Sequence, residues 1–334
     1  MKKLAPILSI ISIVVSSTFA SAAFAQSGAM VKIDGSSTVF PITEAVAEEF
    51  QVSKKNTVKV TVGISGTGGG FKKFCRGEAD VANASRPILK SEMDACAKAG
   101  IKYIEIPVAF DALTVVANSK NTFLKQLTVE QLKKMWEPAA QGKIINWNQI
   151  DASFPDQKLK LYGAGSDSGT FDYFTEATVG KAKSSRGDYT ASEDDNVLVQ
   201  GITRDMGGLA YFGYAYYVEN KSKLKLIPIV NKQGKAVSPS EQTVIDGSYN
   251  PLSRPLFIYI SEKSLARPEV KEFANFYLKN ASHLAKEVKY VPLPAKAYTL
   301  AQEHLDKKKL GTVFDGEPEI GVTIEELLKR EGKL

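Results

Sequence analysis

Three short loops of serine, threonine and glycine could bind an anion, and each lies between a predicted strand and a predicted helix. They read Asp34-Gly35-Ser36-Ser37-Thr38, Ser65-Gly66-Thr67-Gly68-Gly69-Gly70 and Gly165-Ser166-Asp167-Ser168-Gly169-Thr170. The first N–H groups of a helix have no partner within the helix and carry partial positive charge. Glycine lets the backbone approach a ligand, and each hydroxyl can donate to a ligand oxygen.

The repetition of this arrangement carries more weight than any one loop. Serine, threonine or aspartate before a helix is an ordinary N-cap, so one loop alone is weak evidence. All three loops follow the carboxyl ends of predicted strands, which is where α/β folds bind ligands. The sequence therefore predicts a single anion held by several helix N-termini.

Arg86 is the candidate positive charge of this site. It lies in the small, polar segment Asn83-Ala84-Ser85-Arg86-Pro87, directly after the strand-like residues 79–82. An arginine placed there could donate to two anion oxygens at once. An exposed surface charge is the alternative, and the sequence context fits both interpretations equally well.

The elements that position these loops predict an α/β fold. Short β-branched runs alternate with amphipathic stretches from Met30 onward, which is typical of mainly parallel sheets with crossover helices. The aromatic residues from Tyr211 to Tyr217 alternate as in a strand, so they are expected to pack in the core and between lobes. Strands are expected at 30–33, 57–64, 101–107, 113–117, 158–162, 209–214, 224–229 and 256–260, and helices at 42–51, 71–77, 90–99, 129–136, 171–179, 196–204, 268–279 and 324–330.

At these residues the chain resembles the substrate-binding proteins of bacterial phosphate ABC transporters, over nearly all of the sequence that follows the N-terminal segment. The resemblance implies the type II periplasmic-binding-protein fold, in which two lobes joined by two hinge crossovers close on inorganic phosphate. It also implies delivery of phosphate to a membrane ABC permease, and no enzymatic activity. The motifs that carry it are Asp34-Gly35-Ser36-Ser37-Thr38-Val39, Ser65-Gly66-Thr67-Gly68-Gly69, Asn83-Ala84-Ser85-Arg86-Pro87, Ser168-Gly169-Thr170, Gly207-Gly208-Leu209-Ala210-Tyr211 and Arg254-Pro255-Leu256.

Two extended segments, 107–118 and 251–260, are where the chain is expected to change lobe and return. Residues 26–111 and 255–334 would then form lobe I, which is discontinuous, and residues 112–254 would form lobe II. The protein is expected to be a monomer.

The resemblance also assigns phosphate contacts by position. The choice between Ser65 and Thr67 stays open because the second loop carries an extra glycine. The implied ligands are Ser37, Thr38 and the Val39 amide in the first loop, Ser65 or Thr67 with Gly68 in the second, and Ser168, Gly169 and Thr170 in the third.

Arg86 is a departure from the best-known branch of the family. In that branch this loop holds an aspartate, and an arginine precedes the third Ser-Gly-Thr, where this chain has Ala164-Gly165. Arg86 would then be the cationic partner, and the carboxylate that selects phosphate must lie elsewhere. Such an acceptor favours phosphate because phosphate keeps a proton near neutral pH and sulfate does not. Asp172 is the candidate, and its alternative role is to complement the helix dipole.

The N-terminal segment has the pattern of a secretory signal. Lys2 and Lys3 precede an apolar stretch, and Ala23-Phe24-Ala25 precede Gln26, so residues 1–25 are predicted to be a signal peptide cleaved after Ala25. A membrane anchor is the alternative, but serines interrupt an apolar run that is short for a span of roughly 20 residues. A periplasmic location follows from cleavage.

Composition and cysteine content fit an exported anion-binding protein. The 43 basic and 37 acidic residues give a formal net charge of +6, which mildly favours anions, and nucleic acid is not an expected partner. Cys75 and Cys96 are the two cysteines, and an oxidising compartment predicts that they pair. Closing a loop of this length stabilises by roughly 3 kcal/mol in the chain-entropy model. A reactive thiol is the alternative.

Enzyme signatures are weak in this sequence. Asp167 occupies the position where a Gly-x-Ser-x-Gly nucleophile elbow needs serine. His283 and His304 are the two histidines, and both are expected on the surface, which argues against a Ser-His-Asp site. The sequence has no metal-ligand cluster and no nucleotide-binding loop, so no metal and no cofactor are expected. An adhesion or scavenging protein on the same fold is the remaining alternative.

Overall fold

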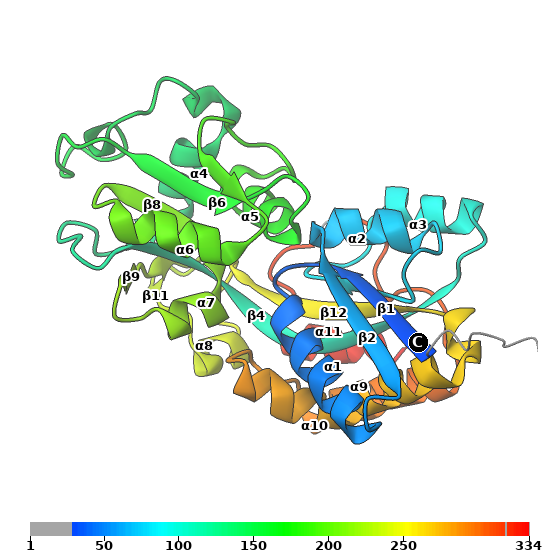
Figure 1. Ribbon diagram of the computed structural model, residues 1–334. Helices are drawn as coiled ribbons and strands as arrows, with labels where there is room; N and C mark the ends of the chain where they lie inside the picture. Colours follow the sequence, from blue (N-terminus) through cyan, green and yellow to red (C-terminus); the bar gives the residue numbers. More distant parts are fainter. Residues whose placement is uncertain (1–28, 318, 334) are drawn as a thin grey trace, which may run out of the picture.

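The molecule has two lobes, each built on one part of a continuous sheet (Figure 1). The computed structural model describes residues 29–317 and 319–333, so the predicted signal peptide, residues 1–25, lies outside the described residues. The strands are β1 (Ala29–Gly35), β2 (Val58–Ile64), β3 (Val81–Ala84), β4 (Tyr103–Asn118), β5 (Leu127–Thr128), β6 (Lys160–Ala164), β7 (Thr190–Ser192), β8 (Gly208–Gly213), β9 (Leu224–Leu226), β10 (Ile229–Val230), β11 (Ala236–Val237) and β12 (Ser253–Ser261). The helices are α1 (Phe40–Ser53), α2 (Gly66–Phe74), α3 (Lys90–Lys98), α4 (Val129–Trp136), α5 (Gly169–Val179), α6 (Asp195–Arg204), α7 (Tyr214–Glu219), α8 (Glu241–Ile245), α9 (Pro268–Glu287), α10 (Ala295–Asp306) and α11 (Ile324–Glu331).

The long strand β4 connects the two lobes. It pairs with β12 over Tyr103–Ala112 and with β8 over Leu113–Ala117, so one strand of 16 residues replaces the two predicted there. The sheet order is β2-β1-β3-β12-β4-β8-β6-β7. β1, β2 and β3 pair in parallel in the first lobe, and β6, β7 and β8 pair in parallel in the second lobe. This confirms the predicted two-lobed α/β fold, while the lobe limits at 111/112 and 254/255 stay a prediction.

Aromatic contacts fix the helices that lead into the predicted anion site. In the first lobe Phe50 of α1 packs edge-on against Phe273 and Phe276 of α9, with ring centroids 5.4 and 5.5 Å apart. In the second lobe Phe174 of α5 stacks on Tyr211 of β8, with centroids 3.8 Å apart. Burying a side chain of this size stabilises by about 1.5–3 kcal/mol, so these contacts hold α1 and α5 against the elements of their own lobes.

Two expectations from the sequence are wrong. β8 ends at Gly213, and Tyr214–Glu219 form the helix α7, so the aromatic run is divided between a strand and a helix, although Tyr211, Phe212 and Tyr216 are buried as expected. His304 is fully buried, with Nδ1 3.2 Å from a carboxylate oxygen of Glu331. The reason is that α10, the helix that carries His304, packs against α11. His283 is exposed, as expected.

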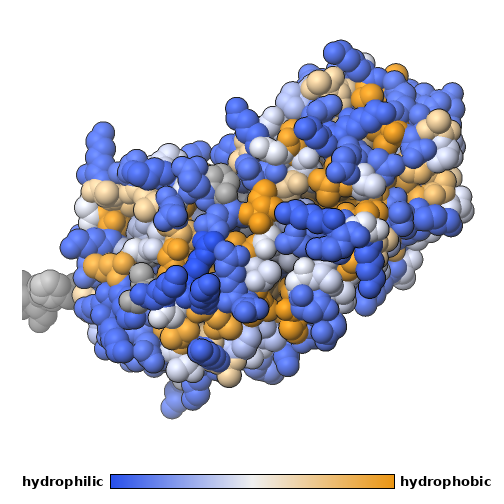
Figure 2. Space-filling model, turned by 180° about the vertical axis from the view of Figure 1, so that it is seen from behind, coloured by the Kyte–Doolittle hydropathy of each residue, from blue (hydrophilic) through white to orange (hydrophobic). Residues whose placement is uncertain are grey.

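The Cys75–Cys96 disulfide is present and connects the end of α2 to α3. It closes a sequence separation of 21 residues and confirms the predicted pairing. Within the described part of the chain, no helix is both long and apolar enough to cross a membrane. Figure 2 shows that hydrophilic residues dominate the face seen from behind, with apolar residues scattered among them in small groups.

Candidate functional site

The first and third predicted loops meet through a pair of threonine hydroxyls. Thr38 precedes α1 in the first lobe, and Thr170 lies in the first turn of α5 in the second lobe. Their hydroxyl oxygens are 2.9 Å apart, and both side chains are fully buried. Ser168 is the N-cap of α5, and its hydroxyl accepts from the Thr170 N–H at 3.1 Å. Two helix N-termini from different lobes therefore face one point.

The second predicted loop joins the same site through another hydroxyl pair, although it is not a loop: α2 begins at Gly66, five residues earlier than predicted. Thr67 lies in the first turn of α2, and its hydroxyl is 3.2 Å from the hydroxyl of Ser85, which follows β3. Gly169 of α5 lies against this pair, because a Cβ at that position would collide with both hydroxyl oxygens. Only glycine at position 169 lets the α5 N-terminus come this close.

A backbone contact brings the two lobes together beside these hydroxyls. The N–H of Gly68 donates to the carbonyl oxygen of Asp167 at 3.3 Å. Gly66 has φ +73°, a conformation that other residues rarely adopt, and a Cβ there would overlap the same Asp167 carbonyl. The contact between the second and third loops therefore depends on the glycines that the sequence places in them.

Some of the other predicted ligands lie at the hydroxyl pairs, and others bond to neighbouring residues that hold the loops in place. Ser65 donates its hydroxyl to the carboxylate of Asp34, which also pairs with Lys73 at 2.6 Å, so Ser65 does not join the hydroxyl pairs. Ser37 is buried next to Thr38. The Val39 N–H, a predicted anion donor, lies 3.4 Å from the hydroxyl oxygen of Ser36. Of the two alternatives in the second loop, Thr67 is the one that faces the other lobe.

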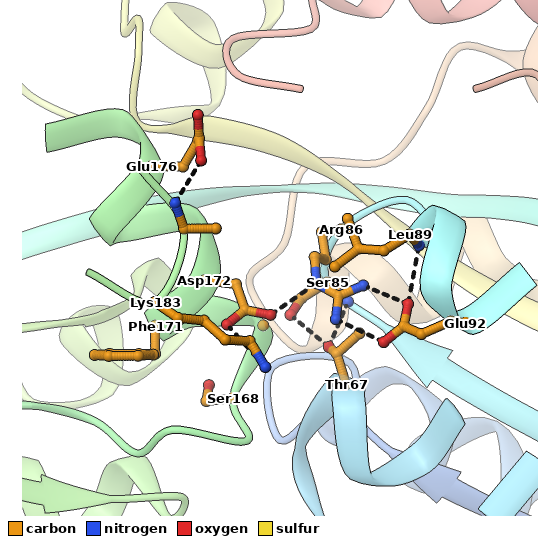
Figure 3. A network of polar contacts seen from close by, with 12 residues as sticks. Thr67, Ser85, Arg86, Leu89, Glu92, Ser168, Phe171, Asp172, Glu176 and Lys183 are labelled. Carbon is orange, nitrogen blue, oxygen red and sulfur yellow. Dashed lines mark hydrogen bonds and ion pairs between the residues drawn. The ribbon is translucent and has the colours of Figure 1, made fainter. Parts of the chain in front are cut away.

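Arg86 and Asp172 face each other across the two lobes (Figure 3). Arg86 Nε donates to Asp172 Oδ2 at 2.9 Å, and its two terminal nitrogens donate to the two carboxylate oxygens of Glu92 at 2.9 Å. Lys183 lies 3.9 Å from the other Asp172 oxygen, which accepts no hydrogen bond from the described residues. The predicted cation and the predicted acceptor therefore form one interlobe ion pair.

Burial sets the titration of this pair. It raises the pKa of the Asp172 carboxyl, and the charges of Arg86 and Lys183 oppose that rise. Burial alone would lower the pKa of Arg86, but the carboxylates of Glu92 and Asp172 outweigh it and raise the pKa above its usual value. Arg86 thus keeps its charge while it is almost fully buried.

Arg254 is a second buried arginine at the site. It is 0% exposed at the start of β12, and its Nη2 lies 3.2 Å from the Thr38 hydroxyl and 2.8 Å from the Thr170 hydroxyl. Nη1 donates to the carbonyl of Gly169 at 3.0 Å. Asp111 of β4 is its carboxylate partner at 3.2 Å. The arginine contacts the loops of both lobes.

Comparison with known proteins shows the family of this chain. The family model of the PBP superfamily domain matches residues 20–281. The chain belongs to the PBP superfamily. Among curated relatives of this PBP chain, Protein SphX of Synechococcus elongatus is 56% identical over 328 residues, covering 98% of this chain and 96% of that protein. The phosphate-binding protein PstS of Staphylococcus saprophyticus is 41% identical over 279 residues, covering 83% and 84% of the two chains.

A solved structure extends the comparison to the fold of this PBP chain. A possible phosphate binding protein from Planctomyces limnophilus is 50% identical, with a TM-score of 0.64, and the match covers 84% of this chain and 98% of that one. The resemblance to the substrate-binding proteins of phosphate transporters is thereby confirmed at the level of the family.

Two residues of the site had no role in the prediction from sequence. Ser85 lies in the same segment as Arg86. Its hydroxyl could have been named as a possible donor to the anion, but only the charge of Arg86 was considered in that segment. Arg254 opens a buried apolar strand. A lone arginine before such a strand is unusual, because arginine is rarely buried without a partner, and that mismatch was the available signal.

Proposed function

We propose that this PBP chain binds one inorganic phosphate ion between its lobes and delivers it to a membrane ABC permease. The observation that supports the proposal is the convergence of the α1, α2 and α5 N-termini on two pairs of buried hydroxyls. A phosphate oxygen that accepts from these hydroxyls would replace their contacts with one another. The relatives named for phosphate binding support the same anion. The proposed ligands are Ser37, Thr38, Val39, Thr67, Gly68, Arg86, Ser168, Gly169, Thr170 and Asp172, with Ser65 as a support of the second loop.

The cellular setting of this function is part of the proposal. Cleavage after Ala25 would release the chain into the periplasm, where the disulfide is stable. The chain would act as a monomer whose lobes, 26–111 with 255–334 and 112–254, close on phosphate, and the closed form would dock on the permease. Catalysis has no part in this role.

Calorimetry on the mature protein tests the function directly. We expect one phosphate bound per chain and competition by arsenate, which has the same shape and protonation. Sulfate should compete poorly, and phosphonates should bind weakly because one oxygen is replaced by carbon. The absence of heat with all four anions would refute phosphate binding. The alternative of an adhesion or scavenging protein that acts without a permease is separated only by a test for the permease partner.

The Asp172 carboxylate is the proposed selector of phosphate over sulfate. Its Oδ1 atom is buried and accepts no hydrogen bond from the described residues, so it can accept the proton that phosphate carries and sulfate lacks. Asp172→Asn is expected to bind phosphate more weakly and to lose part of its discrimination against sulfate. Sulfate competition against bound phosphate measures this. A variant that excludes sulfate as well as the parent does would show that another group makes the selection.

A further inference from the structure

Arg254 occupies a position that neither lobe alone could provide. It lies on β12 directly opposite Asp111 of β4, at the place where the two strands that link the lobes run side by side. Tyr173 of α5 donates its hydroxyl to the carbonyl of Ser253 at 2.6 Å, and Arg254 Nη1 donates to the carbonyl of Gly169. Arg254 and the α5 N-terminus are therefore bonded into one unit, which Thr38 meets from the first lobe.

The hydrogen bonds of Arg254 are unbalanced on one edge of the guanidinium. Nη2 carries two hydrogens but has three acceptors within 3.2 Å, which are the hydroxyls of Thr38 and Thr170 and a carboxylate oxygen of Asp111. Nε, on the same edge, is buried and has no hydrogen-bond partner among residues 29–317 and 319–333. A buried N–H that makes no hydrogen bond costs about 1–3 kcal/mol, and more when it belongs to a charged group such as a guanidinium. This edge is the one that arginine presents to two oxygens of an oxyanion.

Arg254 also differs from Arg86 in its charge balance. Arg86 is held by two carboxylates, with Nε on Asp172 and both terminal nitrogens on Glu92. Among the described residues Arg254 has one carboxylate within ion-pair distance, Asp111, and that contact is longer, at 3.2 Å. Burial raises the pKa of Asp111 to about 6, and Arg254 opposes the rise. Of these two arginines, Arg254 has the fewer carboxylates in contact and the open edge.

We propose that Arg254 is the residue that supplies positive charge directly to the bound anion, through Nε and Nη2. This assignment rests on the proposed function and deepens it, since it places the main charge of the site on a strand that links the lobes rather than in a lobe loop. Phosphate oxygens on this edge would also accept from the hydroxyls of Thr38 and Thr170. The anion would then bond to the first lobe, the second lobe and the connecting strand together, which favours their closed arrangement.

Substitution of Arg254 with a matched buried control tests the assignment. Arg186 lies in the second lobe and is buried too, with 5% of its surface exposed. It donates to the carbonyl oxygens of Met135 and Ile144 and to the carboxylate of Asp188. We expect the phosphate Kd to rise about 100-fold or more in Arg254→Met, which loses a charge-assisted bidentate contact, and about tenfold in Arg254→Lys, which keeps only a point charge. Arg186→Met should bind phosphate as the parent does.

The outcomes separate this assignment from the function on which it rests. Calorimetry gives the Kd, and a melting curve without phosphate establishes that each variant is folded. Folded Arg254→Met and Arg254→Lys with a Kd within threefold of the parent would overturn the assignment. Where Arg254→Met does not fold, Arg254→Lys decides by the same criterion. A parent protein that binds none of the anions would overturn the proposed function itself, and the assignment with it.

Discussion

Gly66→Ala is expected to weaken phosphate binding by about 100-fold, because it pushes the two lobes apart. Gly66 approaches the carbonyl of Asp167 in the other lobe so closely that a Cβ would overlap the oxygen. The obstacle is backbone, which has no rotamer by which to move away, so the second lobe has to shift. The Gly68 N–H to Asp167 bond beside it would then be lost. Calorimetry measures the affinity, and small-angle scattering measures the separation of the lobes.

Gly100 provides a matched control for the backbone strain. Its φ is +70°, close to the +73° of Gly66, but a Cβ at Gly100 would meet no atom within 4 Å. Both alanine variants should lose about 1–2 kcal/mol of unfolding free energy from the left-handed conformation. Only Gly66→Ala should lose affinity for phosphate. Equal phosphate binding by the two variants would mean that the contact between Gly66 and Asp167 plays no part in the bound form.

The anion loops could be predicted from the sequence because their signal is local. Serine, threonine and glycine between a strand and a helix predict a helix N-terminus open to a ligand, and α1, α2 and α5 begin at or next to those loops. The sequence also predicts that Thr38 and Thr170 bind the same anion, but their direct hydroxyl contact could not be predicted, because it depends on how the two lobes are placed. The same holds for the direct ion pair of Arg86 with Asp172, which are 86 residues apart in sequence.

The errors in the fold arose where local propensity and tertiary packing disagree. Aromatic residues favour strands, yet Tyr214, Tyr216 and Tyr217 form a helix that packs against β4 and β8. His304 looks like a surface residue in a lysine-rich stretch, but α11 covers it with Glu331. Arg254 was missed for a related reason, since its environment is made by strands and loops that are distant in the sequence.

Arg86→Ala is expected to cost about 3 kcal/mol or more in phosphate binding, because it breaks a buried ion pair between the lobes. Without the guanidinium, Lys183, at 3.9 Å, is the one cation left near the Asp172 carboxylate among the described residues, and Glu92 loses both of its bonds to Arg86. Removing one partner of a buried pair leaves an uncompensated charge, which costs about 3–5 kcal/mol. The unpaired charge destabilises the closed arrangement of the lobes and not the open one, because separation of the lobes would expose Asp172 to water.

An exposed arginine shows how much of the effect comes from burial. Arg76 pairs with Glu78 at 2.6 Å, but both side chains are more than half exposed, so Arg76→Ala should leave phosphate affinity unchanged.

The double variant Arg86→Ala with Asp172→Asn removes both charges of the interlobe pair. It should lose less affinity than the two single losses added together, because Asp172→Asn removes the charge that Arg86→Ala leaves unpaired. Additive losses would mean that Arg86 and Asp172 act on phosphate independently, and unchanged affinity in Arg86→Ala would remove Arg86 from the binding mechanism.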